Sequence, residues 1–483
     1  MDKIQNYNDA IEYINSIPWT SRSVGLHRIE ALLTEMGRPD RDLKFIHVAG
    51  TNGKGSTCAM LASVFKEAGF ETGLFTSPHL LKYNERMKVN GVDIPDDELA
   101  SVISEVAAAS ERLSLKCNEA GMGYESPSEF EILTAAGLLW FKEKKCDIVV
   151  LEVGLGGEFD STNVIEKKEL AIITPLGYEH TAILGNTMEE IASAKAGIIS
   201  DGCEVVLAFQ GGNLSDINQS ECVCEKIQAS DPEIIRKVVK KVCLQKNAEL
   251  HMPEMDGFSV ISSGLDGQIF ESSYYKEPLK LNLIGEYQLE NALTVLEAVK
   301  VFNEKILKED TKLSSEGKKK LKTDRGRIVS EDAVRRGLEN VVWAARFEVL
   351  KRNPVFILDG AHNPHGIKAA TESLKALFGD KKIVYIVGML GDKNIEEMLG
   401  LLYTNAKSFI TLTPASERAL KGDALAEKIR SDGFAAVSFS EPEEAVKYAL
   451  KSSEKPDGSE AETEVICSLG SLYLAGEIRE CLS

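Results

Sequence analysis

Positions 50–57 hold small and polar residues whose types and spacing could bind phosphate. They read GTNGKGST, follow the apolar run 44–48 and open a helical pattern over 57–68. Glycines let the backbone curl so that successive N–H groups face phosphate oxygens, and the N-terminus of the next helix adds partial positive charge. Lys54 adds a full charge. The standard phosphate-loop spacing is not met, because Gly55 follows the lysine, so a plain glycine-rich turn is the alternative. The residues that we expect to contact nucleotide are Asn52, Gly53, Lys54, Gly55, Ser56 and Thr57.

Other side chains could hold a metal ion beside that phosphate. Glu152 lies near the end of the apolar run 147–153, which is typical of a strand buried on both faces. Open α/β sheets bind ligands at the carboxyl ends of their strands. Magnesium prefers oxygen ligands, so a carboxylate, the Ser77 hydroxyl and phosphate oxygens would suit it. Taken singly, Ser77 could be a turn residue and His180 a structural hydrogen-bonding residue.

One lysine, Lys195, stands in the nearly apolar segment 191–199. Burial lowers a lysine pKa and leaves a neutral amine that can react with carbon dioxide. The alternative is an ordinary solvated lysine whose aliphatic stem lies along a helix.

The elements that must position these residues alternate between strands and helices. Apolar runs at 44–48, 147–153 and 171–174 predict a mostly parallel sheet with helices on both sides. Residues 200–282 contain shorter β-like runs and predict a β-rich insertion. A second α/β unit begins near 355–359 and continues with predicted strands at 383–387, 408–412 and 465–467. The lysine-rich stretch 305–327 predicts a solvated helix or loop extension.

The composition limits the classes of function that the chain can have. The 483 residues predict two or three domains, and 43% hydrophobic residues fit a globular protein with a sizeable core. A net charge of −19 argues against nucleic-acid binding, which needs a basic surface. Nine scattered cysteines indicate reduced thiols in the cytoplasm. We expect no signal peptide, because the N-terminal residues 1–6 contain no apolar run. We expect no membrane span and no membrane partner, because no apolar stretch reaches about 18 residues.

The loop 50–57 resembles the compressed phosphate loop of the Mur-ligase superfamily, and within it that of the folylpolyglutamate synthases and dihydrofolate synthases. Further matching segments follow in family order at 76–80, 151–157, 179–185, 191–199, 285–292, 343–348 and 358–364. The resemblance implies an α/β fold with two domains. Residues 1–342 would form an ATP-binding, P-loop ATPase-like central domain with a mostly parallel sheet. Residues 347–483 would form a smaller, Rossmann-like glutamate-ligase domain.

The resemblance also implies roles for single residues. Two magnesium ions would be held by Ser77, Glu152, His180 and a carbamylated Lys195. ATP would contact Asn291, Arg346 and Asp359, and the catalytic residues would be Lys54, Lys195 and His362. The chain departs from the family at Glu179, usually aspartate, at Ala194, often glutamate, and at Ala344 and Ala345, usually proline and glycine. Because alanines replace proline and glycine at these two positions, the sequence does not predict the backbone conformation there.

The implied reaction is an ATP-dependent ligation. ATP would phosphorylate a substrate carboxylate to an acyl phosphate, which the amine of L-glutamate then attacks. Phe130 and Phe159 could stack on the pterin of a folate or dihydropteroate, or could equally be core residues. The pterin-binding residues by resemblance are Pro127, Ser128, Glu129, Phe130, Phe159, Asp160 and Ser161.

Two other functions remain open at this point. A Mur-type ligase of cell-wall precursors is the nearer one, and a nucleotide-binding switch without ligase chemistry is the other. Retention of Glu152, His180 and Lys195 argues against a switch, which needs no second metal. We expect a cytoplasmic monomer acting on small molecules, and the sequence does not choose between dihydrofolate synthesis, extension of the glutamate tail, or both.

Overall fold

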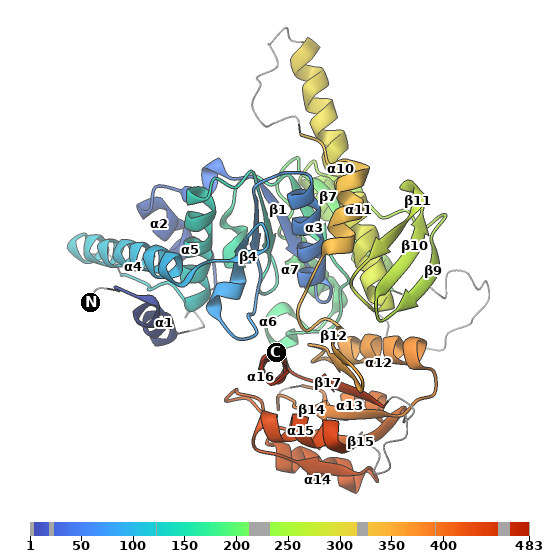
Figure 1. Cartoon of the computed structure of the whole chain (residues 1–483). Helices are drawn as coiled ribbons and strands as arrows, with labels where there is room; N and C mark the ends of the chain where they lie inside the picture. Colours follow the sequence, from blue (N-terminus) through green and yellow to red (C-terminus); the bar gives the residue numbers. More distant parts are fainter. Residues whose placement is uncertain are drawn as a thin grey trace. The chain divides into compact units, whose positions relative to one another are not determined.

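The computed structural model describes residues 4–18, 24–121, 123–211, 232–315, 327–391, 393–452 and 464–482. The chain divides into two compact units (Figure 1). Unit 1 comprises Met1–Asp256 and Glu290–Asn340, and unit 2 comprises Gly257–Leu289 and Val341–Ser483. The predicted α/β fold class is confirmed in both units.

Unit 1 is built on an eight-stranded sheet with the order β4-β3-β2-β5-β1-β6-β7-β8. The six strands from β2 to β8 in this order are parallel, whereas β3 and β4 add an antiparallel edge. The strands are β1 (Phe45–Ala49), β2 (Thr72–Phe75), β3 (Met87–Val89), β4 (Val92–Asp93), β5 (Ile148–Glu152), β6 (Leu170–Ile173), β7 (Glu204–Leu207) and β8 (Glu249–His251).

Helices cover both faces of this sheet. Phe45, Phe75 and Leu151 share one core with helices on the first face. On the other face α3 packs against α10 and α11, through the Phe65–Phe302 ring pair and a hydrogen bond from Ser63 Oγ to Gly337 O. The helices are α1 (Tyr7–Ser16), α2 (His27–Glu35), α3 (Lys54–Glu67), α4 (Asp96–Glu119), α5 (Glu129–Glu143), α6 (Thr181–Leu184), α7 (Met188–Ala196), α9 (Pro232–Gln245), α10 (Glu286–Ser315) and α11 (Glu331–Asn340), with short 3₁₀ turns η1 (Pro39–Asp42), η2 (Tyr83–Arg86) and η3 (Ser161–Val164).

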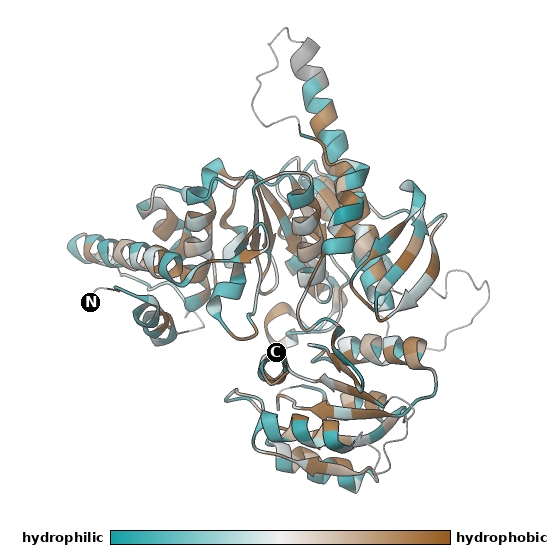
Figure 2. Ribbon diagram, in the orientation of Figure 1, coloured by the Kyte–Doolittle hydropathy of each residue, from teal (hydrophilic) through white to brown (hydrophobic). Residues whose placement is uncertain are grey.

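The central strands are apolar apart from His47 in β1 and Glu152 at the end of β5, because both of their faces are buried. Figure 2 shows these strands largely in brown, while the outer helix α4 alternates brown with teal. Since β1, β2, β5 and β6 are parallel, the loops that follow them leave the sheet at one edge. The predicted phosphate and metal residues of unit 1 follow or end one of these four strands, except Lys195 in α7 and Asn291 in α10.

Unit 2 contains a six-stranded sheet with the order β12-β13-β17-β14-β15-β16, parallel except for β12, and a three-stranded antiparallel sheet, β11-β10-β9. The last strand in sequence, β17, is therefore in the middle of its sheet. The elements are β9 (Ser259–Gly264), β10 (Gly267–Ser272), β11 (Tyr275–Leu281), β12 (Glu348–Arg352), β13 (Val355–Leu358), β14 (Ile383–Val387), β15 (Ala406–Thr411), β16 (Ala436–Ser438), β17 (Val465–Leu469), α12 (Pro364–Phe378), α13 (Ile395–Tyr403), α14 (Gly422–Ser431), α15 (Pro442–Ser452) and α16 (Leu472–Glu480).

The structure differs from the β-rich insertion that the sequence predicts at 200–282. Its first part supplies β7, α9 and β8 to unit 1, and residues 212–231 lie outside the described residues. Only the antiparallel strands after residue 257 form a separate sheet, and they group with unit 2. Gln268 Nε2 donates to the carbonyls of Leu283 and Gly285, which fixes that sheet to the chain before α10. Arg352 pairs with Asp266 at 2.6 Å, which fixes it to β12.

The lysine-rich stretch 305–327 continues α10 as far as Ser315, and residues 316–326 lie outside the described part of the chain. Among the helices that the structure describes, none has both the length and the apolar content that crossing a bilayer requires.

Candidate functional site

The glycine-rich loop joins the buried end of β1 to the first residue of α3. Gly53 has a φ of +82°, a left-handed conformation that glycine adopts without strain, and a Cβ there would overlap the side-chain amide of Asn291. The predicted ATP contact Asn291 therefore lies directly against the predicted phosphate loop. Thr51 N and Asn52 N both donate to Pro175 O, at 3.0 and 3.2 Å, so these two N–H groups hold the loop to the chain after β6.

Thr51 N and Asn52 N are already bonded to Pro175 O, so the groups available to bind an anion are those at the N-terminus of α3. The first backbone hydrogen bond of the helix runs from Thr57 N to Gly53 O, so the N–H groups of Lys54 and Gly55 have no acceptor within the helix. Thr57 Oγ1 is buried and has no hydrogen-bond partner among the described residues. A phosphate oxygen or a metal ion would satisfy these donors and this hydroxyl.

Two lysines converge on the backbone of the loop. Lys54 Nζ donates to the carbonyls of Gly50 and Thr51, each at 3.2 Å, and Lys195 Nζ donates to Gly50 O at 2.7 Å. Burial, with a smaller contribution from the charge on Lys54, lowers the pKa of Lys195 from 10.5 to about 7; Glu179 and Asp160 act in the opposite direction. The amine of Lys195 is thus about half neutral near pH 7.

Glu152 and Ser77 meet at the edge of the sheet where β5 and β2 end. Glu152 is the last residue of β5, is buried, and accepts a hydrogen bond from Ser77 N at 3.1 Å. Burial first, and then the charge of Glu152, raise the pKa of the Cys58 thiol, while Lys54 lowers it. The Glu152 carboxylate and the Lys54 amine therefore both act on the first turns of α3.

His180 lies after β6 and before α6, in a left-handed conformation with a φ of +53°. Its Nε2 is 3.8 Å from Glu179 Oε1, and its side chain is about half exposed. The structure brings the Ser77 backbone to Glu152, and Lys195 to the loop. His180 lies on the loop that follows β6, the strand that pairs with β1 on the side away from β5.

In unit 2, Asp359 organises the turn after β13. Its carboxylate accepts hydrogen bonds from Phe347 N at 2.7 Å, Ala361 N at 2.7 Å and Tyr287 Oη at 3.2 Å. Burial raises the pKa of Asp359, and Arg346 opposes this rise. His362, two residues after Gly360, has Nδ1 at 2.8 Å from Gly360 O, which places its proton on Nδ1 because a carbonyl oxygen only accepts.

The backbone around Arg346 keeps an unusual conformation despite its alanines. Ala345 has a φ of +52° and Phe347 one of +50°, both in the left-handed region that L-residues with side chains disfavour. Gly360 N donates to Ala345 O at 2.8 Å, and so does Arg346 through one guanidinium nitrogen at 2.9 Å. Replacing the family glycine by Ala345 has therefore left a left-handed residue in place.

The chain matches known proteins along nearly its whole length. Residues 48–299 match the Mur ligase middle domain, and residues 345–470 match the Mur ligase glutamate ligase domain. A dihydrofolate synthase/folylpolyglutamate synthase of Bacillus subtilis strain 168 is 33% identical over 478 residues, with 99% of each chain covered. A folylpolyglutamate synthase of Lacticaseibacillus casei is 31% identical over 483 residues, again with 99% of each covered.

The chain belongs to the Mur ligase family, in its dihydrofolate synthase/folylpolyglutamate synthase branch. The resemblance found in the sequence is thereby confirmed. Among solved structures, a Mycobacterium tuberculosis folylpolyglutamate synthase complexed with ADP and AMPPCP is 26% identical with a TM-score of 0.80, covering 100% of this chain and 99% of that one.

In this Mur ligase the two predicted substrate segments lie on either side of Gly154. Phe130 is partly buried; its ring lies 6.1 Å from that of Phe75, and a Cβ on Gly154 would overlap it. Phe159 is 57% exposed. The structure thus gives different surroundings to two aromatic residues that the sequence could not distinguish: Phe130 packs on the core and Phe159 presents an open ring.

Several residues of the substrate segments have hydrogen bonds within the chain. Ser128 caps α5 and shares a capping box with Glu131, which Arg28 pairs at 3.1 Å. Pro127 is buried beside it, and Glu129 lies 3.8 Å from Arg86. Asp160 is fully buried, and Ser161 begins η3.

A buried relay that sequence reasoning missed joins Asp160 to the central strand. Asp160 accepts from Leu155 N at 2.8 Å and Thr162 N at 3.0 Å, and also from Thr162 Oγ1. Since the Thr162 hydroxyl donates to Asp160, its oxygen accepts from His47 Nε2, which lies 2.8 Å away on β1. Burial lowers the pKa of His47, so the ring is neutral. Only the unusual position of a histidine inside an apolar strand hinted at this relay.

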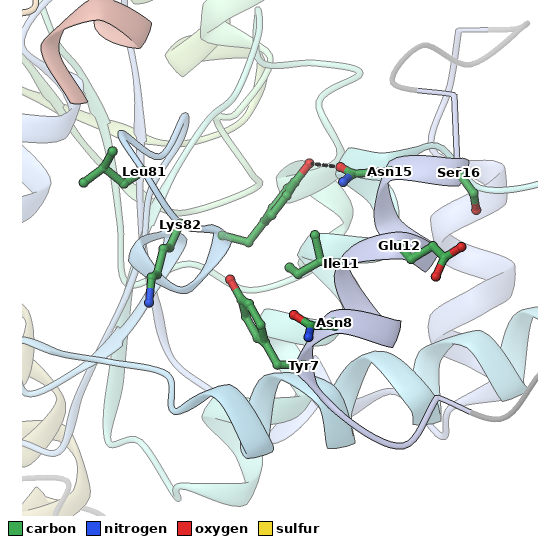
Figure 3. A pocket seen from close by; sticks show the side chains of 9 residues that line it. Tyr7, Asn8, Ile11, Glu12, Asn15, Ser16, Leu81 and Lys82 are labelled. Carbon is green, nitrogen blue, oxygen red and sulfur yellow. Dashed lines mark hydrogen bonds between the residues drawn. The ribbon is translucent and has the colours of Figure 1, made fainter. Parts of the chain in front are cut away.

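A shallow pocket of about 660 Å³ lies between α1 and the segment Leu81, Lys82 and Tyr83. Figure 3 shows Tyr7 and Ile11 of α1 facing this segment, and Tyr83 Oη donates to Asn15 Oδ1 at 3.0 Å. None of its nine lining residues is a predicted site residue of this Mur ligase.

Proposed function

We propose that this chain is an ATP-dependent ligase that joins L-glutamate to the carboxylate of a folate or of dihydropteroate through an acyl phosphate. The observation that supports it most is the meeting of Lys54 and Lys195 on Gly50 O, at the sheet edge where Glu152 holds Ser77. Relatives named for this reaction match the chain from end to end.

The phosphate loop binds the triphosphate of ATP in this proposal. Gly53 and Gly55 keep the backbone open to phosphate, and Lys54 exchanges its carbonyl partners for phosphate oxygens. Asn52, Ser56 and Thr57 complete the cradle, and Asn291 contacts the nucleotide beside Gly53.

The residues present fit magnesium. The buried Thr57 hydroxyl lacks a partner among the described residues, and Glu152 offers a buried carboxylate at the same end of α3. We propose that Ser77, Glu152 and His180 hold one ion and that a carbamylated Lys195 helps to hold a second. Bound magnesium supplies positive charge that offsets the charge of the transferring phosphoryl group.

Carbamylation of Lys195 requires a neutral amine, and the lowered pKa of about 7 supports it. In that reaction the neutral amine nitrogen forms a bond to the carbon of CO₂, one C=O π bond gives its electron pair to oxygen, and the nitrogen releases a proton to solvent. A neutral amine thereby becomes a carbamate anion. The carbamate anion would be attracted by the charge of Lys54, which acts on Lys195 in the present structure.

Unit 2 supplies the remaining predicted groups. Arg346 binds phosphate as a charged fork, Asp359 belongs to the ATP contact, and His362 acts near the reacting carboxylate. Because three donors already bind Asp359, its role is to fix the turn that carries His362 as well as to meet ATP.

For the second substrate we propose that Phe159 stacks on the pterin, since its ring is the exposed one. Pro127, Ser128, Glu129, Phe130, Asp160 and Ser161 then shape the surrounding loops. The ligase acts as a monomer in the cytoplasm on small molecules, and sedimentation of the purified protein at micromolar concentration tests the first part of this statement.

The deciding experiment measures phosphate release by the purified protein with ATP, Mg²⁺ and L-glutamate, adding dihydropteroate or tetrahydrofolate in separate reactions. Turnover that requires both glutamate and one of the pterins is the expected result. Comparing the two pterins decides between dihydrofolate synthase, folylpolyglutamate synthase and both. No turnover with either pterin refutes the folate assignment.

Two variants test the residue roles. Lys54→Ala and Glu152→Gln should lower kcat by at least about 100-fold, because each removes charge stabilisation of the phosphoryl group. Lys66→Ala is the matched control, since Lys66 is exposed in the last turn of the same helix. Retained activity in either site variant removes that role.

A further inference from the structure

A second cluster of metal-binding side chains lies on the far edge of the unit 1 sheet. Glu249 and His251 are alternate residues of the edge strand β8, so their side chains point to the same face. Glu204, the first residue of β7, is the register partner of Glu249, and Val206 is that of His251. Leu250, between them, packs into the core on the opposite face.

The three groups converge. Glu204 Oε2 lies 2.8 Å from His251 Nε2, and one ligand atom from each of the three residues lies within 4.8 Å of the others. Atoms bound to a tetrahedral zinc ion at about 2.1 Å are roughly 3.4 Å apart, so a shift of about 1 Å would close the set. Glu204 and His251 are 14% and 16% exposed, and Glu249 is 61% exposed and has room to make this shift.

The charges around the cluster leave it open to a cation. Nearby lysines of α10 pair closely with other carboxylates: Lys305 with Glu169 at 2.8 Å and Lys300 with Glu254 at 2.6 Å. Lys308 Nζ, in contrast, stays 3.7 Å from Glu249 Oε2 and is mostly exposed. Such an exposed surface pair is weak, so a divalent ion can displace it.

We propose that Glu204, Glu249 and His251 bind one divalent transition-metal ion of the zinc class and so tie the edge strand β8 to β7. An imidazole with two carboxylates suits zinc, cobalt or nickel, whereas magnesium and calcium prefer oxygen ligands alone. Glu204 begins its strand, so the site lies at the amino end of the sheet, opposite the edge that carries the phosphate loop. It is therefore a different site from the one proposed for ATP.

The test titrates the EDTA-treated full chain with ZnCl₂ by calorimetry, in millimolar Mg²⁺ and ADP to fill the ATP site. One equivalent of zinc per chain and a zinc-dependent rise in the thermal midpoint are expected. His251→Ala and Glu204→Gln should each weaken binding by more than about 100-fold, since loss of a direct ligand exceeds the 10- to 100-fold effect of an outer-shell partner.

His27→Ala is the matched control, because His27 Nε2 also pairs with one carboxylate, that of Glu125, at 2.9 Å. Among the described residues, His27 does not belong to a group of three side chains close enough to share a metal ion. Glu204→Gln changes one atom and keeps the test valid if His251→Ala fails to fold. Zinc binding that is unaffected by both variants, or that vanishes only in His180→Ala, overturns the proposal.

Discussion

Lys195 shows how a single buried side chain couples chemistry to stability. It lies in an apolar helix, and its amine has a backbone carbonyl rather than a carboxylate as its acceptor. The folded chain therefore holds the amine with a pKa of about 7, against 10.5 for a free lysine. Burying the protonated form costs free energy, so the charged amine destabilises the fold.

The pH dependence of stability follows from this difference. Between pH 7 and pH 10.5 the unfolded chain binds the Lys195 proton and the folded chain does not. The free energy of unfolding should therefore rise with pH in this window by about 1.4 kcal/mol per unit relative to Lys195→Met, which has no proton to release.

Urea unfolding of both proteins at pH 7 and pH 9, without metal or CO₂, measures this difference. Lys66→Met, an exposed change, should give no such divergence. Parallel curves for the wild type and Lys195→Met would mean that the amine keeps its proton in the folded state.

Ala345 carries a backbone strain that a smaller residue would remove. Its φ of +52° disfavours a Cβ by roughly 1–2 kcal/mol, whereas loss of one buried methyl costs about 0.8 kcal/mol. Glycine also costs about 0.4–1 kcal/mol through the larger entropy of the unfolded chain, so Ala345→Gly should change the free energy of unfolding by less than about 1 kcal/mol in either direction.

Ala344→Gly, at the preceding residue, provides the comparison. Ala344 is not among the described residues with positive φ, so glycine there should destabilise by about 0.5–1 kcal/mol. The thermal midpoint should therefore fall more for Ala344→Gly than for Ala345→Gly, and an equal or larger fall for Ala345→Gly would contradict the strain.

At the scale of elements, the loop after β5 joins the sheet edge that carries Glu152 to α7. Glu158 N donates to Ala194 O at 2.9 Å, and a Cβ on Gly157 would overlap the backbone of Lys195. The relay through Thr162 fixes the other end of this loop to β1. The loop therefore sets the position of Lys195 and of the exposed Phe159 together.

Thr162→Val tests the relay, since valine has the same shape but no hydroxyl. It leaves Asp160 and His47 each short of a buried partner, which should cost about 2–4 kcal/mol. Thr134→Val is the control, because the buried Thr134 hydroxyl only bonds back to Phe130 O in its own helix and should cost much less. Equal decreases in the thermal midpoints of Thr162→Val and Thr134→Val would show that the hydrogen bonds through Thr162 do not stabilise the fold.

Much at this scale was predictable. Buried parallel strands are continuous apolar runs, so β1, β5, β6, β13, β14 and β15 were anticipated within about two residues. Strands β4 and β8 are two and three residues long and carry no periodic signal, so they were missed. The partners of His47 and Ser128 come from tertiary packing, which spacing along the chain does not encode.

At the scale of the whole molecule, two units are assembled from interrupted stretches of chain. The sequence placed the second unit after residue 347, whereas Gly257–Leu289 also groups with it. Nothing in the pattern of β9–β11 indicates which core these strands join, because that choice depends on contacts such as Gln268 with Leu283 and Gly285.

Removing the end of the chain should affect one unit only. A variant that stops at residue 463 lacks β17, which lies between β13 and β14 and pairs with both. Amide exchange should then become fast in β13 and β14 while β1 and β5 stay protected. A variant that stops after Glu480 keeps β17 and α16 and serves as the control; persistent protection of β14 in the shorter chain would contradict the prediction.

The central place of β17 also governs how this protein matures on the ribosome. Its neighbour β13 ends at Leu358, but β17 begins only at Val465, so the hairpin β12–β13 and the ribbon β14–β15–β16 emerge as separate halves. At roughly 5–20 residues per second, β13 waits about 5–20 s with one edge unpaired before the joining strand is made. We therefore expect nascent chains to pass through a stage in which β13 and β14 each have an unpaired edge, and a chain that stops before Val465 to leave the six-stranded sheet incomplete.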